Sequence, residues 1–188
     1  MIDAVIALDV SPSMGRPSEG LKPSKLAVAR DAVAYAASRL LEASPRARLG
    51  LLLFYRHAYP LLPPTSDRGL IAKALALVRV LGPGTAPGEA VVEAVKMLRG
   101  SRRRRRVVIV TDGGFNEGVR LDYTAYYAAA SGVEVDIATL GEEPPKRDRE
   151  LIVATAKRTG GRWLHAPSRD EAYRALAELL LPGLEGPR

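Results

Sequence analysis

The chain has no cysteine and no glutamine, and its one asparagine is Asn116. Without cysteine it can form neither disulfides nor thiolate metal sites, and no mechanism can use a cysteine nucleophile. No apolar run approaches the roughly 20 residues that span a bilayer. The N-terminus also lacks the basic, apolar and small-residue succession of a secretory signal. We therefore expect a cytoplasmic protein.

Basic residues outnumber acidic ones: the chain has 28 Lys and Arg residues and 21 Asp and Glu residues, for a formal net charge of +7. Such a chain favours anionic partners, either acidic protein surfaces or nucleic acid. The scarcity of amides beside many charged residues favours a thermophilic source, although a GC-rich genome gives the same bias. A length of 188 residues suits one domain with a full core. We expect that domain to cover residues 1–181 and a short tail to follow at 182–188.

Strand and helix patterns alternate along the chain. Strand patterns occur at residues 4–8, 49–55, 58–62, 107–111, 133–140 and 162–166. Helix patterns occur at residues 24–43, 66–80, 88–98, 121–131, 148–159 and 168–181. This alternation predicts a doubly wound α/β fold with a mainly parallel, six-stranded sheet and helices on both faces. A tight turn at Arg56 and His57 leads into the third strand, and Pro63 and Pro64 follow it, so we expect a short antiparallel edge strand.

Oxygen-bearing side chains follow two of the buried strands. Asp9 directly follows an apolar run, with Ser11 and Ser13 at the next alternate positions, and Asp112 directly follows the run at 107–111. Thr85 lies in a separate loop rich in Gly and Pro. Ligands of such sheets bind at the carboxyl ends of strands, where the strand order reverses. If the two strands flank that reversal, the carboxylates face one crevice.

An all-oxygen set of this kind suits a hard divalent cation, Mg²⁺ or Mn²⁺. Any one of these residues could simply be a loop cap, since Asp, Ser and Thr are common in that role. All five at these places in the strand and helix alternation favour a metal site. The predicted ligands are Asp9, Ser11, Ser13, Thr85 and Asp112.

The same residues carry a resemblance to a known family. The segment ALDVSPSM at 7–14 resembles the DxSxS motif of von Willebrand factor type A domains, with Pro12 where a glycine is frequent. The pairs at 84–85 and 111–113 resemble that family's separated threonine and aspartate, and KLAVAR at 25–30 is similar to the start of its first helix. The resemblance implies the family's Rossmann-like fold and a metal-ion-dependent adhesion site (MIDAS).

In such a site, the resemblance implies that Ser11 and Ser13 coordinate directly, while the other three ligands bind directly or through water. It implies a protein-interaction module and not an enzyme, in which a partner's Asp or Glu replaces water at the metal. Stand-alone domains of this family in microbes often serve AAA-type ATPases of the chelatase class, so such an ATPase is a candidate partner. Next to the ligands, Met14, Gly113 and Phe115 are candidate partner contacts, although Phe115 could equally anchor its loop.

The strongest charge cluster is the run Arg102, Arg103, Arg104, Arg105 and Arg106. It could form a patch for an anionic partner, which makes a basic nucleic-acid-binding protein the main alternative function. It could also be the solvated end of a helix, where cations are favourable. The run has no interleaved aromatic residues of the kind that single-strand binders use.

A second alternative is a Mg²⁺-dependent phosphotransferase with Asp9 as the nucleophile. Phosphatases of the haloacid dehalogenase type place an Asp at the end of the first strand, followed two residues later by a second acid that acts as general acid. The present chain has Ser11 at that second position. We therefore rank this function below the other two.

Overall fold

A computed structural model describes residues 1–181, and the expected tail at 182–188 lies outside the described residues. The sheet consists of β1 (Ile2–Asp9), β2 (Arg48–Phe54), β3 (Ala58–Thr65), β4 (Arg104–Thr111), β5 (Val133–Leu140) and β6 (Trp163–Ala166). Their order in space is β3-β2-β1-β4-β5-β6. Among these strands β3 runs antiparallel to its neighbour, and the other pairs are parallel. The predicted mainly parallel sheet is therefore confirmed.

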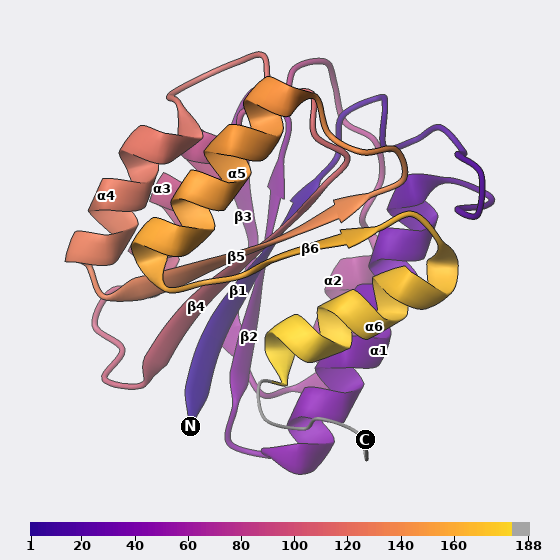
Figure 1. The fold of residues 1–188 in the computed structure, drawn as a ribbon. Coiled ribbons are helices and arrows are strands. Elements are labelled where there is room, and N and C mark those ends of the chain that lie inside the picture. Colours follow the sequence, from indigo (N-terminus) through magenta and orange to yellow (C-terminus); the bar gives the residue numbers. More distant parts are fainter. Residues whose placement is uncertain (182–188) are drawn as a thin grey trace, which may run out of the picture.

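Helices cover both faces of the sheet (Figure 1). One face packs against α1 (Lys25–Ala43), α2 (Arg68–Ala76) and α6 (Arg169–Leu180). The opposite face packs against α3 (Pro87–Met97), α4 (Leu121–Ala130) and α5 (Lys146–Thr159). Because both faces are covered, β1 is apolar at successive positions: Ile6 faces the first core and Val5 the second. No helix within residues 1–181 has the length and apolar character that a bilayer crossing needs.

Side-chain caps define where several helices begin. The Ser24 hydroxyl accepts the N–H of Ala27 at 3.1 Å, as predicted for the first helix. Ser168 forms a reciprocal capping box at the start of α6. For α2, however, the cap is Asp67 and not Ser66, and the helix ends at Ala76 instead of continuing to residue 80. Beyond the helix, the N–H of Leu81 donates to the carbonyl of Val10 at 3.0 Å, so the chain runs past the carboxyl end of β1 before it reaches Thr85.

The edge strand differs from its prediction in length. We expected residues 58–62, but β3 continues through Pro63 and Pro64 to Thr65. Its pairing with β2 shifts register twice, between Leu49 and Leu52. An edge strand pairs on one side only, so prolines are tolerated wherever no N–H is needed for the ladder. The prolines therefore make the strand irregular without ending it.

Candidate metal centre

The carboxyl ends of β1 and β4 lie side by side at the point where the strand order reverses. From β1 the chain passes to β2 on one side, and later returns through α3 to β4 on the other side. In the register of this pair Leu8 lies opposite Val110, so Asp9 and Thr111 end the two strands together. The predicted position of the crevice is confirmed, and Asp112 follows directly in the loop after β4.

Asp9 is fully buried and is held through both of its carboxylate oxygens. Its Oδ1 accepts the backbone N–H of Ser11 at 2.9 Å, and its Oδ2 accepts the hydroxyl of Thr111 at 2.6 Å. Burial raises the pKa of Asp9 to about 7, against the lowering effect of these hydrogen bonds, and the nearby charge of Asp112 adds to the rise. The side chain of Asp9 is thus fixed in position, and a cation placed nearby would stabilise its ionised form.

Three further oxygens form a row beside Asp9. The hydroxyl oxygens of Ser11 and Ser13 lie 3.1 Å apart, and the Ser13 hydroxyl donates to Oδ1 of Asp112 at 3.1 Å. Adjacent ligands of an octahedral Mg²⁺ with bonds of 2.0–2.1 Å lie about 2.9 Å apart. The spacing of these oxygens therefore fits neighbouring corners of one octahedron with small adjustments.

Thr85 approaches the same place on the loop between α2 and α3. It is buried, its N–H donates to the side-chain oxygen of Asn116 at 2.9 Å, and its carbonyl accepts the N–H of Asn116 at 3.2 Å. The loop after β4 is fixed in turn by Asp148 of α5, which accepts the N–H groups of Gly114 and Phe115. The chain's single asparagine thus joins the two loops that carry Thr85 and Asp112.

An open hollow of about 500 Å³ lies above this cluster. Four of the five predicted ligands line it, namely Ser11, Ser13, Thr85 and Asp112. Asp9 is absent from the lining because its side chain is fully buried. The hollow also contains groups that the sequence did not suggest: Lys25, Asn116, Glu142 and Glu143.

The donor chemistry of the cluster fits a hard cation. Within residues 1–181, no group of three or more His, Cys, Asp or Glu side chains is placed to hold a metal. A metal here would depend on hydroxyls together with carboxylates, which are ligands of Mg²⁺ and Mn²⁺. Ser11, Ser13 and Asp112 would hold it, and Asp9, whose oxygens already accept two protein hydrogens, would act through water.

Lys25 lines the hollow and pairs with a predicted ligand, although the sequence did not mark it as a site residue. Its Nζ lies 2.5 Å from Oδ2 of Asp112, and the two side chains are only 13% and 8% exposed. The pairing joins residues 87 positions apart in the chain. The available signal was its place directly after the helix cap Ser24, at the first residue of α1.

The three candidate partner contacts have different surroundings. The prediction of Met14 as a partner contact is wrong, because its side chain is fully buried in the core that packs against α1. Phe115 is half-buried and packs against the core formed with α3, α4 and α5, which is the alternative role of a loop anchor. Gly113 is buried at φ +86°, a conformation that favours glycine, and it lines the hollow with its backbone.

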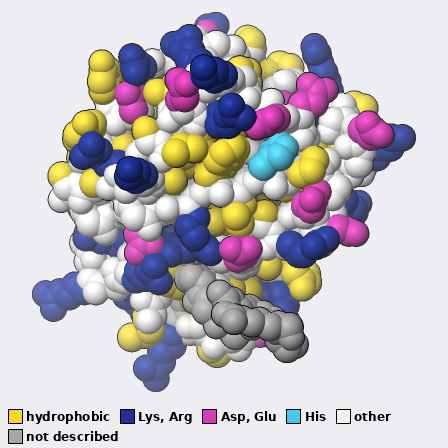
Figure 2. All heavy atoms as spheres, viewed as in Figure 1, with side chains coloured by type: hydrophobic (Ala, Val, Ile, Leu, Met, Phe, Trp, Pro, Cys, Tyr) yellow, Lys and Arg dark blue, Asp and Glu magenta, His cyan; other side chains and the backbone are white. Residues whose placement is uncertain are grey.

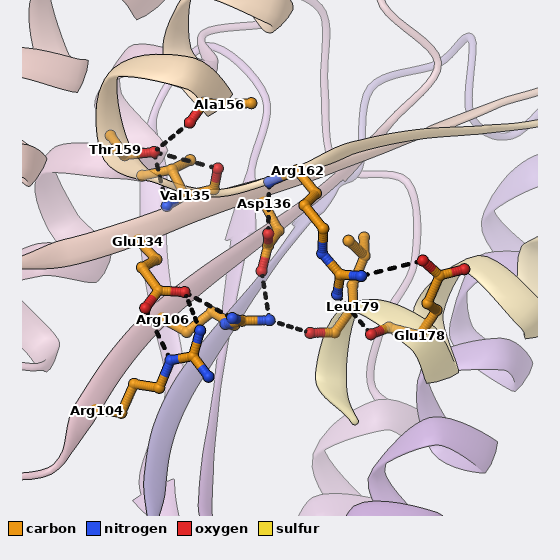
Figure 3. A network of polar contacts seen from close by, with 10 residues as sticks. All are labelled: Arg104, Arg106, Glu134, Val135, Asp136, Ala156, Thr159, Arg162, Glu178 and Leu179. Carbon is orange, nitrogen blue, oxygen red and sulfur yellow. Dashed lines mark hydrogen bonds and ion pairs between the residues drawn. The ribbon is translucent and has the colours of Figure 1, made fainter. Parts of the chain in front are cut away.

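The arginine run is mostly part of the sheet. β4 begins at Arg104, and Arg106 is only 2% exposed (Figure 3). Its guanidinium lies 3.0 Å from Asp136 and 2.6 Å from Glu134, both on β5. Arg104 pairs with the same Glu134 at 2.8 Å. These arginines are neutralised by the neighbouring strand.

The other three arginines of the run differ in their contacts and exposure. Arg103 donates to Asp3 at 3.1 Å, Arg105 is half-buried, and Arg102 is exposed. On the face in Figure 2, basic side chains are scattered with acidic ones between them. Carboxylates of the same chain therefore pair with three of the five arginines that we predicted as a patch for an anionic partner, namely Arg103, Arg104 and Arg106.

The chain is similar to known proteins in sequence and in fold. The UPF0353 protein of Mycolicibacterium paratuberculosis (strain ATCC BAA-968 / K-10) is 29% identical over 203 residues, which cover 93% of this chain and 58% of that protein. The solved structure of BatB from Bacteroides thetaiotaomicron has 22% identity and a TM-score of 0.80, over 96% of this chain and 97% of that chain.

A second similar structure contains a metal. Proximal thread matrix protein 1 from the mussel byssus, solved with a zinc-occupied MIDAS motif, has 15% identity and a TM-score of 0.79, over 95% of this chain and 44% of that chain. At such identities the two structural matches show the shared fold. The model of the von Willebrand factor type A domain matches residues 4–115, from β1 to the loop after Asp112. This chain therefore belongs to the von Willebrand factor type A family.

Proposed function

We propose that this domain is a metal-dependent protein-interaction module in which Mg²⁺ or Mn²⁺ at a MIDAS coordinates an acidic residue of a partner. The observation that carries the proposal is the row of oxygens from Ser11 through Ser13 to Asp112, with spacings of 3.1 Å, at the floor of an open hollow. A divalent cation held there supplies an electrophilic position for a carboxylate oxygen. Its output is binding, and we propose no enzymatic turnover.

The charges around the hollow support an acidic partner. Asp9 and Asp112 together carry at most two negative charges, and Lys25 offsets one of them at 2.5 Å. The hydroxyls of Ser11 and Ser13 add none. With a dication bound, the metal, Lys25 and these two carboxylates sum to one positive charge at the floor, which favours a partner's carboxylate at that point. Glu142 and Glu143 add negative charge elsewhere on the lining, where Glu143 pairs with Arg149.

The alternative functions have less support. A nucleophilic Asp9 would need an exposed carboxylate oxygen, whereas Asp9 is 0% exposed and both oxygens accept protein hydrogen bonds. Nucleic-acid binding through the arginine run would need free cations, and Arg103, Arg104 and Arg106 are paired with carboxylates. We therefore retain an AAA-type ATPase of the chelatase class in the cytoplasm as the candidate partner and setting.

Metal binding can be tested first, by titrating Mn²⁺ into the domain in a calorimeter. Ser13→Ala removes a central oxygen of the row and should weaken Mn²⁺ binding at least tenfold. Ser66→Ala is the matched control, because Ser66 is exposed in the segment between β3 and α2. Equal Mn²⁺ affinity in both variants would show that the ion binds elsewhere.

The partner's carboxylate can be tested with acetate as a probe. Excess acetate should displace water from the Mn²⁺–protein complex and lower its enhancement of water-proton relaxation. If acetate leaves the enhancement of water-proton relaxation unchanged, the metal has no coordination position that a carboxylate can take. For the ATPase, coexpression and pull-down in Mg²⁺ or in EDTA should recover partner only with Mg²⁺, and equal recovery would rule out a metal bridge.

A further inference from the structure

The floor of the hollow holds one basic side chain in close contact with a proposed ligand. Lys25 Nζ lies 2.5 Å from Oδ2 of Asp112, while the other oxygen of that carboxylate accepts the Ser13 hydroxyl. Among the described residues that line the hollow, Lys25 is the only cation. One carboxylate is therefore shared between the oxygen row and an internal ammonium group.

The fold holds Lys25 in this position from several sides. Its backbone N–H donates to the carbonyl of Arg16 at 3.2 Å, and the next N–H, of Leu26, donates to Met14 at 2.7 Å. The lysine stem passes over Gly141 at the end of β5, where an added Cβ would come within 3.0 Å of Lys25 Cδ. The side chain is thus directed into the hollow by the start of α1 and has room because residue 141 is glycine.

We propose that Lys25 is an internal cation that competes with the divalent metal for Asp112. This inference rests on the proposed metal site. In the metal-free domain, the ammonium group offsets the repulsion between the carboxylates of Asp9 and Asp112. When a dication binds, the same positive charge opposes it across a few ångströms, so Lys25 weakens metal binding.

The competition has a functional consequence. A site with two carboxylates and no lysine would hold its metal more tightly and would be occupied at lower metal concentrations. Lys25 shifts occupancy to higher concentrations and keeps the empty site ordered. The module would then engage a carboxylate partner only while the metal supply is sufficient.

Calorimetric titration with Mn²⁺ tests the proposal directly. Lys25→Met removes the charge at similar length and should bind Mn²⁺ about tenfold more tightly than the parent. Lys25→Arg keeps the charge, so its Mn²⁺ affinity should stay within about threefold of the parent's. It should not show the gain expected for Lys25→Met. Lys96→Met is the matched control, because it removes the same charge and an ion pair with Glu93 on the distant last turn of α3.

Thermal unfolding gives a second measurement that does not depend on a partner. Without metal, Lys25→Met should melt at a lower temperature than the parent, because Asp112 loses its counter-charge. The rise in melting temperature on adding Mn²⁺ should be larger in this variant than in the parent. In Lys96→Met, the metal-free melting temperature should not fall as it does in Lys25→Met. The increase in melting temperature on adding Mn²⁺ should equal that of the parent.

The outcomes separate the two proposals. If Lys25→Met, or Lys25→Gln should the first variant fail to fold, binds Mn²⁺ no more tightly than the parent, the competition is wrong and the metal site stands. Equal tightening in Lys25→Arg also overturns it, since the charge would not be the cause. If neither the parent nor any Lys25 variant binds Mn²⁺, the proposed function itself fails.

Discussion

The hydroxyl of Thr111 donates to Oδ2 of Asp9 at 2.6 Å and so joins the last residues of two neighbouring strands. The other oxygen of Asp9 accepts the N–H of Ser11. Asp9 therefore has a fixed orientation before any metal arrives, which reduces the conformational entropy lost on binding. The same contact fixes the start of the loop that carries Asp112.

Removing the charge of Asp9 should abolish most of the metal affinity. Asp9→Asn keeps the shape and one carbonyl oxygen, so we expect the fold to persist while Mn²⁺ affinity drops at least tenfold. Thr111→Val keeps the volume but removes the donor, and it should weaken Mn²⁺ binding by a smaller factor. Calorimetry measures both, and parental affinity in Asp9→Asn would contradict the assignment of Asp9.

Arg106 should be the arginine of the run that matters most for stability. Arg106→Met leaves the buried Asp136 without its cation, and removing one partner of a buried pair costs about 3–5 kcal/mol. Arg102→Gln alters an exposed side chain and should change the free energy of unfolding by less than about 0.5 kcal/mol. Urea unfolding compares them, and a similar small effect of both would show that the buried pair contributes little.

Asp3 should make the domain sensitive to acid. Burial alone would raise its pKa, but hydrogen bonds from Arg48 and Ser101 and the charges of Arg48 and Arg103 lower it from 3.8 to about 2. A folded-state pKa below the unfolded value gives stability that is present above pH 4, approximately, and is lost as the pH falls through about 2. The amount is about 2 kcal/mol.

Comparison with Asp3→Asn isolates this contribution, because the other carboxylates titrate in both proteins. The stability difference between parent and variant, measured by urea unfolding, should be largest near neutral pH and should shrink toward about pH 2. A difference that stays constant over this range would show that the ionised form of Asp3 is not what stabilises the fold.

The end of α6 should not respond to metal binding. Arg106 donates to the carbonyl of Leu179, and Arg162 donates to the carbonyl of Glu178 at 2.6 Å and pairs with its side chain at 3.0 Å (Figure 3). These contacts hold the last turn of the helix against the sheet. Hydrogen exchange with and without Mn²⁺ should change in the loops around Thr85 and Gly113 and remain constant across α6. A large change in α6 would show that the helix moves.

Much of the site could be predicted because its signals are local. Asp9, Ser11 and Ser13 follow one buried strand within five residues, and Asp112 follows a second. An apolar run reports burial on both sides of a sheet, and the alternation with helices implies parallel strands whose carboxyl ends share an edge. These facts place the ligands near one another without any knowledge of long-range contacts.

The tertiary structure alone decided which charges meet. Five consecutive arginines have the sequence pattern of a solvated cluster, yet Arg106 is buried because Glu134 and Asp136 lie on the adjacent strand, 28 and 30 positions away. Lys25 likewise meets Asp112 only because α1 begins beside the end of β4. Periodicity and spacing determine whether a residue lies on a strand, a helix or a loop, but the charge that faces it comes from a distant segment. The sequence therefore predicted which oxygens gather at the strand ends, and only the fold supplied the charges that face them.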